Sequence, residues 1–165
     1  MQHIQSFAPI ENADARILIL GSMPGDASLR ARQYYAHPRN LFWRIMGELL
    51  DTDPASPYDR RIQALKSARI ALWDVLRSCR RKGSLDSNID QESLVPNDFA
   101  AFFRCHPKIT HVFFNGAKAE EYYRKHVLPA AGIETIEYLR LPSTSPANAS
   151  ISYERKLESW RVITG

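Results

Sequence analysis

The sequence predicts an α/β protein built around a parallel β-sheet with helices on both of its faces. Short apolar segments rich in strand-forming residues alternate along the chain with segments of helical periodicity, which is the pattern of such folds. The chain has 165 residues, of which 44% are apolar, so it can bury the core of one domain. We therefore expect a single domain over residues 1–165.

The first half of the chain contains two predicted strands. Residues 16–20 form a short apolar run that ends at a glycine. The apolar residues of the segment 41–50 fall on one stripe, which predicts a helix, and a second helix is expected over 58–66. Residues 69–75 form the next strand. The polar segment that follows, residues 77–96, contains Gly, Ser and Asn, and we expect it to be the main irregular loop.

The second half of the chain repeats the alternation of helix and strand. Asn97 is the expected N-cap of a helix that runs to Cys105. The remaining predicted elements are a strand over 109–114, a helix over 118–127, a strand over 135–141 that Pro142 terminates, and a closing helix over 153–163.

Four segments with unusual residues follow the four predicted strands. They are residues 21–25, 73–74, 115–116 and 142–148. In open parallel sheets, the carboxyl ends of the strands meet at one edge, and ligands bind beyond that edge. We therefore expect these four segments to form one site.

The charge pattern is compatible with a polyanionic partner. The chain has 22 Lys and Arg against 18 Asp and Glu, a net charge of +4. Arginines cluster in the acid-free stretch 27–47 and again in 77–82. Solvated surface is an equally good explanation of such clusters, so charge alone leaves both interpretations open.

Several chemistries are excluded by missing motifs. Two cysteines, Cys79 and Cys105, are too few for a disulfide scaffold, a four-thiolate zinc site or a cysteine-ligated iron–sulfur cluster. The five histidines lack metal-ligand spacing, and there is no dinucleotide fingerprint, P-loop or Gly-x-Ser-x-Gly elbow. No apolar run is long enough to span a bilayer and no signal peptide is visible, so we expect a cytoplasmic protein.

Two segments have the composition of a DNA-contacting surface. The segment 33–43 places two tyrosines beside basic residues, as in a stacking platform for bases. Core packing of the tyrosines and helix capping by Asn40 are the alternative interpretations. Residues 142–148 are rich in Ser, Thr and Pro and carry no charge, so they are suited either to gripping a phosphate or to an ordinary surface turn.

Taken together, three motifs resemble those of the uracil-DNA glycosylase superfamily. They are Gly-Ser-Met-Pro-Gly at 21–25, Tyr-Ala-His-Pro-Arg-Asn-Leu-Phe-Trp at 35–43 and Leu-Pro-Ser-Thr-Ser-Pro-Ala-Asn at 141–148. The resemblance is closest to the hypoxanthine-DNA (deoxyinosine) glycosylase branch. The first two motifs are also similar to those of the mismatch-specific uracil/thymine glycosylases.

The resemblance implies a three-layer α/β/α sandwich with a central four-stranded parallel sheet. It implies a monofunctional enzyme that flips a deaminated base out of duplex DNA and hydrolyses its N-glycosidic bond with water. Hypoxanthine is the expected base, with uracil and xanthine as further candidates. No metal or organic cofactor is expected, the simplest oligomeric state is a monomer, and in a bacterium the protein would associate with the nucleoid.

The resemblance also assigns catalytic residues. In the mismatch-specific branch, the position of Met23 holds the asparagine that positions the attacking water, and a methionine side chain has no comparable hydrogen-bonding capacity. The hypoxanthine branch shares this departure. Its important asparagines match Asn40, which we expect to position the water, and Asn115, which would support the base or the water.

Base-binding and DNA-binding roles are implied in the same way. Tyr35 matches the aromatic residue that stacks against the flipped base. The backbone around Ser22 and Met23 would contact a base carbonyl, and the Asp74 carboxylate would accept a hydrogen bond from a base N–H. The residues expected to contact the DNA backbone are Arg39, Arg77, Arg80, Arg81, Ser143, Ser145 and Asn148.

Three other functions remain open at this stage. The first is a G:U or G:T mismatch-specific glycosylase. The second is a non-catalytic domain that binds damaged DNA, which the absence of a polar side chain at Met23 favours. The third is a flavodoxin-like module for small nucleotides, which the missing phosphate-binding fingerprint disfavours.

Overall fold

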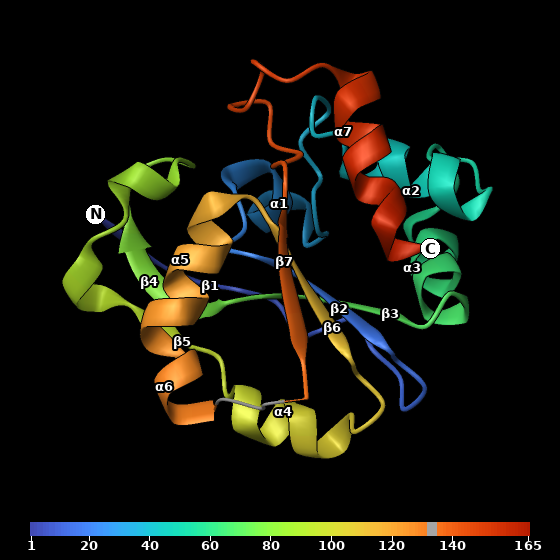
Figure 1. Cartoon of the computed structure of the whole chain (residues 1–165). Helices are drawn as coiled ribbons and strands as arrows, with labels where there is room; N and C mark the ends of the chain where they lie inside the picture. The colour runs from blue at the N-terminus through green and yellow to red at the C-terminus, as the bar shows by residue number, and fades with distance from the viewer. Residues whose placement is uncertain (132–134) are drawn as a thin grey trace.

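A four-stranded parallel sheet forms the centre of the protein (Figure 1). This computed structural model describes residues 1–131 and 135–165. The strand order is β3-β2-β6-β7, so β2 and β6 are the inner strands. The strands are β2 (Ile17–Gly21), β3 (Ile70–Asp74), β6 (His111–Asn115) and β7 (Glu137–Leu141).

Helices cover both faces of this sheet (Figure 1). One face packs against α4 (Phe99–Cys105), α5 (Ala117–His126) and the short α6 (Leu128–Ala131). The other face packs against α2 (Phe42–Leu50), α3 (Tyr58–Ser67) and α7 (Tyr153–Trp160), which continues as the 3₁₀ helix η3 (Arg161–Ile163). The predicted fold class, a three-layer α/β/α sandwich, is confirmed.

Side chains alternate between two apolar cores because successive residues of a strand point to opposite faces. In β2, Leu18 and Leu20 belong to the core under α4 and α5, whereas Ile19 belongs to the core under α2 and α7. All three are fully buried. Burial of such a side chain stabilises the fold by roughly 1.5–3 kcal/mol.

Every predicted strand and helix is present, with small shifts at its ends. The expected N-cap of α4, Asn97, is wrong by one residue. Asp98 caps this helix, because its Oδ1 accepts from the backbone N–H of Ala101 at 3.0 Å. Asn97 instead donates its amide to the carbonyl oxygen of Asp74, at 2.8 Å.

The predicted irregular loop over 77–96 is wrong, because it contains two strands of a second sheet. This antiparallel sheet has the order β1-β4-β5. Its outer strands, β1 and β5, come from the chain's start and from just before α4, and this pairing is invisible to local sequence. The bounds are β1 (Gln2–Gln5), β4 (Leu76–Arg81) and β5 (Val95–Pro96), and two 3₁₀ helices, η1 (Asp86–Asn88) and η2 (Gln91–Ser93), lie between β4 and β5.

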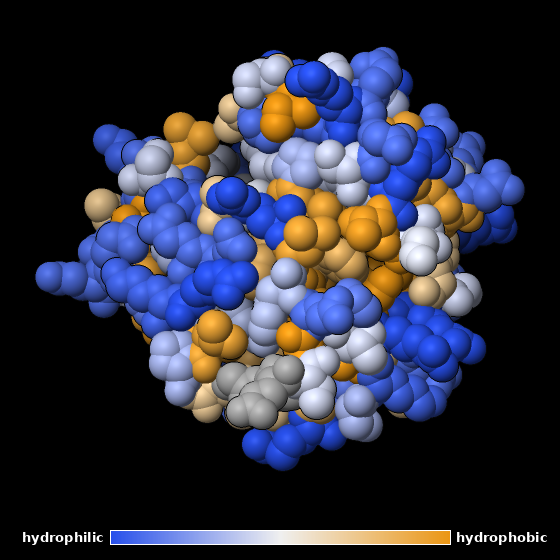
Figure 2. Space-filling model, viewed as in Figure 1, coloured by the Kyte–Doolittle hydropathy of each residue, from blue (hydrophilic) through white to orange (hydrophobic). Residues whose placement is uncertain are grey.

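The carboxyl ends of the parallel strands point toward the top and the left of Figure 1. Here β2 leads to residues 22–25 and the short α1 (Asp26–Ala31), and β7 leads to the loop before α7. The face in Figure 2 is mostly hydrophilic, with apolar residues gathered between β7 and α7. Among the described residues, no helix is long and apolar enough to cross a membrane.

Candidate active site

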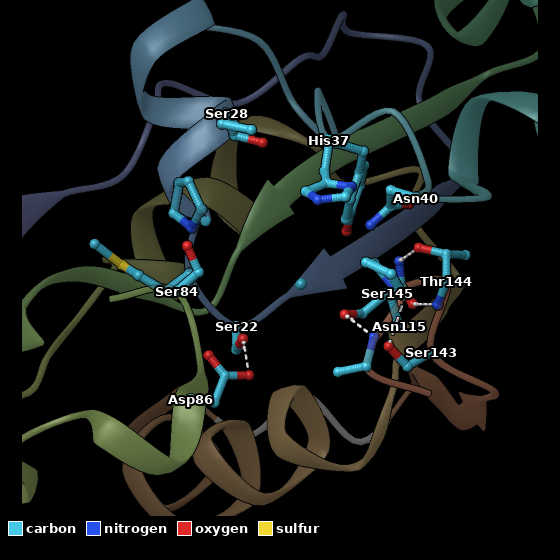
Figure 3. A pocket seen from close by; sticks show the side chains of 18 of the residues that line it. Ser22, Ser28, His37, Asn40, Ser84, Asp86, Asn115, Ser143, Thr144 and Ser145 are labelled. Atoms are coloured by element: carbon cyan, nitrogen blue, oxygen red, sulfur yellow. Dashed lines mark hydrogen bonds between the residues drawn. The ribbon is translucent and has the colours of Figure 1, made fainter. Parts of the chain in front are cut away.

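A cavity of about 470 Å³ opens at the carboxyl edge of the parallel sheet (Figure 3). Residues at the carboxyl ends of all four strands, or shortly after them, line it, so the predicted convergence of the strand ends is confirmed. The segment 34–40 closes one wall, and a loop between β4 and η1 closes another. The polar side chains drawn around the cavity include Ser22, His37, Asn40, Asp86, Asn115, Ser143, Thr144 and Ser145.

Gly21 lies at the base of this cavity, at the last residue of β2. A Cβ atom there would lie 2.6 Å from Oδ1 of Asp74 and 2.8 Å from the hydroxyl oxygen of Tyr35. Both distances are far below van der Waals contact, so only glycine allows the two side chains to pack over the strand end. The pairing of Gly21 with Asp74 in the β2–β3 register holds the carboxylate at this place.

Tyr35 has an unusual backbone conformation beside the cavity. Its φ of 55° is in the left-handed region, which is uncommon for a residue other than glycine. Its ring stacks on Phe42 with the ring centroids 4.3 Å apart. The hydroxyl is buried and has no hydrogen-bond partner among the described residues. Burial and the nearby Asp74 carboxylate raise the pKa of Tyr35 above its ordinary value, against a smaller opposing effect of the neighbouring Asn115 amide, so the hydroxyl remains a neutral donor.

Asp74 is the most perturbed acid of the site. The residue is only 3% exposed, and its Oδ2 has no hydrogen-bond partner within the described chain. Burial, helped by the negative charge of Asp86 and opposed by Arg81, raises the pKa of Asp74 to about 7. A buried carboxyl with a free oxygen is costly to maintain and is typical of a binding or catalytic group.

Asp86 connects the loop between β4 and η1 to the glycine-containing loop 21–25. Its Oδ2 accepts a hydrogen bond from the Ser22 hydroxyl at 2.7 Å (Figure 3). Burial raises the pKa of Asp86, while the Ser22 hydrogen bond and the positive charge of Arg81 act in the opposite direction. Ser22 and Met23 both line the cavity, as predicted for base-contacting residues, although their contact with a base stays a prediction.

Arg81 is buried, so the prediction that it contacts DNA phosphates is wrong. It is 1% exposed, and its guanidinium donates to the carbonyl oxygens of Pro24 and Gly83, each at 2.6 Å. The side chain therefore ties the two loops together beneath the surface. A charged cluster in the sequence does not reveal which of its members is buried, because the burial pattern of β4 is irregular and turns Arg81 inward while Arg77 and Arg80 stay exposed.

The other arginines remain on the surface. Arg39 is exposed at the rim of the cavity. Arg77 and Arg80 are exposed on β4, outside the residues that line the cavity, and Arg80 pairs with Asp90 at 2.5 Å. Contact of these three residues with DNA stays a prediction.

The Asn40 side chain has an oxygen that stabilises the start of α2 and an amide nitrogen that is available to a ligand. Its Oδ1 accepts from the backbone N–H of Phe42 at 2.9 Å, in the first turn of α2. Because a backbone N–H requires an oxygen acceptor, this contact fixes the orientation of the amide. The amide nitrogen then points into the cavity (Figure 3). The capping interpretation and the functional interpretation of this residue are therefore compatible.

Asn115 is engaged with the loop between β7 and α7. Its Nδ2 donates to the Thr144 hydroxyl at 3.0 Å, and its Oδ1 accepts from the Thr144 backbone N–H at 2.9 Å (Figure 3). Gly116 beside it has a φ of 96°, and a Cβ there would lie 2.9 Å from the Ser143 Cβ. The geometry of Asn115 is that of a positioning residue for the loop.

The same loop, residues 142–148, is held from α7 as well. Trp160 Nε1 donates to the Pro142 carbonyl at 2.9 Å, and the buried Lys156 Nζ donates to the Asn148 carbonyl at 2.6 Å. Ser143 and Ser145 hydroxyls each accept a backbone N–H within the loop. Since accepting leaves the hydroxyl hydrogen free, both can still donate to a phosphate oxygen.

Sequence reasoning missed several residues of the cavity. No local motif marks Ser84 and Asp86, because their approach to the loop 21–25 depends on the β4 turn. Thr144 lies within the segment 142–148, which is predicted to contact phosphate. Its side chain is fully buried and accepts a hydrogen bond from Asn115, so it holds the loop in place instead. Among residues 1–131 and 135–165, no group of three or more His, Cys, Asp or Glu side chains is suited to hold a metal ion.

Comparison with known proteins agrees with this architecture. The sequence model of the uracil DNA glycosylase superfamily matches residues 8–163. The chain belongs to the uracil DNA glycosylase superfamily. Within that superfamily it is similar to proteins named hypoxanthine DNA glycosylase. The relative from Methanosarcina barkeri is 41% identical over 153 residues and covers 92% of each chain, and that from Methanosarcina acetivorans is 39% identical over 160 residues and covers 96% of each chain.

A solved structure has the same superfamily fold. It is a solution NMR structure of a candidate uracil DNA glycosylase from Methanosarcina acetivorans. The TM-score is 0.82 at 37% identity, and the match covers 99% of this chain and 98% of that one. The similarity therefore extends over the whole sandwich, including the loops that line the cavity.

The burial of Asp74 predicts a specific pH dependence of stability. Because its pKa is raised to about 7, the folded protein retains a proton that the unfolded chain has lost, and stability falls as pH rises toward that value. The Asp74→Asn variant has no carboxyl proton to lose, so its stability does not fall in this way. Its free energy of unfolding relative to wild type should therefore be more favourable at about pH 8 than at about pH 5, as measured by chemical denaturation.

Asp14→Asn is the matched control, because Asp14 is exposed and its pKa is lowered by Lys108. The titration of that carboxyl is complete below about pH 5, so its substitution should have the same effect at both pH values. An equal effect of Asp74→Asn at both pH values would contradict the raised pKa.

Removal of the Asn115 side chain should loosen the loop 142–148. Asn115→Ala leaves the buried Thr144 N–H without its acceptor, which costs about 1–3 kcal/mol of stability. Hydrogen exchange at the Thr144 amide should accelerate more than exchange in the core strand β2. Asn12→Ala, which removes an exposed acceptor for the Asp14 N–H, is the control. Unchanged exchange at Thr144 would show that other contacts hold the loop.

Proposed function

We propose that this protein is a monofunctional DNA N-glycosylase that removes hypoxanthine from duplex DNA, with uracil and xanthine as further substrates. The observation that carries this proposal is a pair of buried, unpartnered polar atoms at the base of the cavity, Asp74 Oδ2 and the Tyr35 hydroxyl oxygen. One is an acceptor when ionised, and the other is a neutral donor. Superfamily membership and the relatives' names support the same activity.

The acceptor and the donor of this pair are complementary to the hydrogen-bonding edge of a deaminated base. Deamination of adenine turns ring atom N1 from an acceptor into an N–H donor and replaces the amino group by a carbonyl oxygen. Ionised Asp74 accepts from that N–H, and the Tyr35 hydroxyl donates to the carbonyl. This role differs from the stacking role that the resemblance implies for Tyr35, whose ring stacks on Phe42. Adenine presents the opposite polarity at both positions. The site would then leave two buried polar groups unpaired, which gives strong discrimination.

The chemistry requires a positioned water and little more. Water adds to the sugar C1′ as the bond from C1′ to the base nitrogen breaks. The bonding electron pair leaves with the base, the water releases a proton, and the base takes one up. Asn40 contributes a fixed amide N–H that holds the water by one of its lone pairs. An amide is not a base, so Asn40 acts by position rather than by proton abstraction.

The DNA backbone is held by the rim of the cavity. The free hydroxyl hydrogens of Ser143 and Ser145, the Asn148 amide and the exposed Arg39 would bind phosphates next to the flipped nucleotide. Flipping costs a few kcal/mol and least at a mismatched pair, so deaminated bases, which pair poorly, are favoured for kinetic reasons too. We propose that the protein acts as a monomer on such duplexes, in the cytoplasm.

One observation favours a second candidate function. Met23 is buried at the cavity, in the motif position where the mismatch-specific branch has a water-positioning asparagine. A protein that had lost its catalytic group would bind damaged duplexes without cleaving them. The excision assay below separates the two functions.

The first activity prediction concerns Asn40. End-labelled duplexes with one hypoxanthine, uracil, xanthine or mismatched thymine are incubated with the protein and then treated with alkali. Wild type should give scission at hypoxanthine, and Asn40→Ala should lower the single-turnover rate by about 10²–10³-fold, since one positioned hydrogen-bonding group is lost. The control is Asn12→Ala, which removes a half-buried asparagine side chain outside the cavity.

Each alternative result has a definite meaning. Scission only at uracil or mismatched thymine would support a mismatch-specific glycosylase. Binding without scission at any lesion would support the non-catalytic candidate. Wild-type rates in Asn40→Ala would assign the positioning of water to another residue.

The second activity prediction concerns Asp74. The ionised carboxylate is a much stronger acceptor for the base N–H than the neutral acid, so the excision rate should rise with pH through about 7, the pKa to which burial raises this group. Asp74→Asn should be slower and should lose this rise. Asp14→Asn, which lies outside the cavity, should keep the wild-type profile. A wild-type profile in Asp74→Asn would remove Asp74 from the reading of the base.

A further inference from the structure

Ser28 is a buried hydroxyl residue of α1 that lines the cavity. It is 6% exposed, and Figure 3 shows its hydroxyl oxygen directed away from α1 and toward the cavity. Buried polar side chains are nearly always hydrogen-bonded, so the partners of this hydroxyl indicate what else it can bind.

The Ser28 hydroxyl accepts one hydrogen bond and still has its hydrogen to donate. Its Oγ accepts from the backbone N–H of Ala36 at 3.1 Å, and a hydroxyl that accepts keeps one O–H donor. A helical serine often bonds to the carbonyl oxygen four residues earlier. Here that oxygen, of Pro24, accepts from Arg81 at 2.6 Å, and within residues 1–131 and 135–165 no group accepts from Ser28. The O–H is therefore a buried donor that is available to a ligand.

This donor lies next to the two groups that are proposed to bind the base. The Ala36 N–H that Ser28 accepts belongs to the peptide bond after Tyr35. Tyr35 in turn meets Asp74 above Gly21, whose missing Cβ admits both side chains. One wall of the cavity thus presents the Asp74 acceptor, the Tyr35 donor and the Ser28 donor, with Tyr35 between the other two.

Deaminated purines have the complementary order of groups along one edge. Hypoxanthine and xanthine present the N1–H, the carbonyl oxygen on C6 and the lone pair of N7, which are one donor followed by two acceptors. Uracil and thymine present the N3–H and the carbonyl oxygen on C4, but the next ring position is a carbon. It carries a hydrogen in uracil and a methyl group in thymine, so neither pyrimidine offers an acceptor to a third group.

We propose that the Ser28 hydroxyl donates to N7 of the flipped base and makes the site selective for deaminated purines over pyrimidines. This inference rests on the proposed function, because it assumes a base that Asp74 and Tyr35 hold in the cavity. As the glycosidic bond breaks, negative charge spreads over the leaving purine and reaches N7, so a donor there stabilises the transition state as well as the bound base. A pyrimidine leaves the buried O–H unpaired, which disfavours its binding.

The test combines Ser28→Ala with a substrate that lacks only the proposed acceptor. Matched duplexes carry one hypoxanthine, one uracil, or one 7-deazahypoxanthine, in which a C–H group replaces N7. Single-turnover excision rates and duplex affinities, by fluorescence anisotropy, are measured for each. Dividing the rate of the variant by that of wild type on the same duplex cancels the intrinsic differences in bond strength between the bases.

Ser93→Ala is the matched control variant. The Ser93 hydroxyl likewise accepts a backbone N–H, that of Arg80 at 2.7 Å, and Ser93 lies outside the cavity. Its substitution therefore removes the same atoms and a similar hydrogen bond away from the base. Excision of each base by Ser93→Ala should match wild type.

Ser28→Ala should lower the excision of hypoxanthine by about tenfold, the effect expected for one hydrogen bond to a buried group. It should leave the rates on 7-deazahypoxanthine and uracil unchanged, because neither base has the acceptor. An equal loss on all three duplexes would overturn the proposal, since Ser28 would then act only by holding the backbone beside Tyr35. Unchanged excision of hypoxanthine would overturn it as well.

Failure of the proposed function gives a different result. In that case wild type excises none of the bases, and the affinities still test the contact. Tighter binding of the hypoxanthine duplex than of the 7-deazahypoxanthine duplex, lost in Ser28→Ala, supports the N7 contact without catalysis. Equal affinities in wild type, or a difference that persists in Ser28→Ala, would overturn the contact too.

Discussion

The site depends on keeping one carboxyl group, that of Asp74, buried beside the end of β2. Removing a carboxylate from water is costly unless its oxygens are paired, and here Oδ2 is not paired within the described chain. The parallel register brings Asp74 to Gly21, and the missing Cβ of that glycine admits both the carboxyl and the Tyr35 hydroxyl. The stability of the sheet thereby offsets the cost of a buried, unpaired oxygen in the group that is proposed to bind the base.

The walls of the cavity are braced from opposite faces of the same sheet. Arg81 and the Ser22–Asp86 hydrogen bond join the loop after β2 to the loop after β4. Asn115 and residues of α7 hold the loop after β7. Groups fixed in this way need little rearrangement when a substrate binds. Hydrogen bonds stabilise a transition state most when their donors and acceptors are already in position. This rigidity suits a reaction in which no strong base is available.

Much of this arrangement could be predicted from the sequence, for identifiable reasons. Three of the parallel strands, β2, β3 and β6, contain short apolar runs that predict buried strands, and their ends lead to the cavity. The edge strand β7 contains Glu137 and Arg140 and is marked instead by the proline that follows it. Strand β4 is not predicted because Arg77 and Arg80 give it a polar composition, although four of its six residues are buried without a regular alternation. The roles of Arg81 and Asp86 depend on loops that meet only after folding, and no spacing along the chain encodes their contacts.

Reading a base by hydrogen-bond polarity has a consequence for substrate range. Hypoxanthine, xanthine and uracil share an N–H next to a carbonyl, so the pair formed by Asp74 and Tyr35 would accept a purine or a pyrimidine by the same two contacts. Thymine and guanine carry this edge as well, and normal copies of both bases have to be rejected by other means. A thymine paired with adenine is costly to flip, whereas a mismatched or deaminated base is not. Selection would therefore be divided between the duplex, which decides what leaves the stack, and the buried pair, which decides what stays in the cavity.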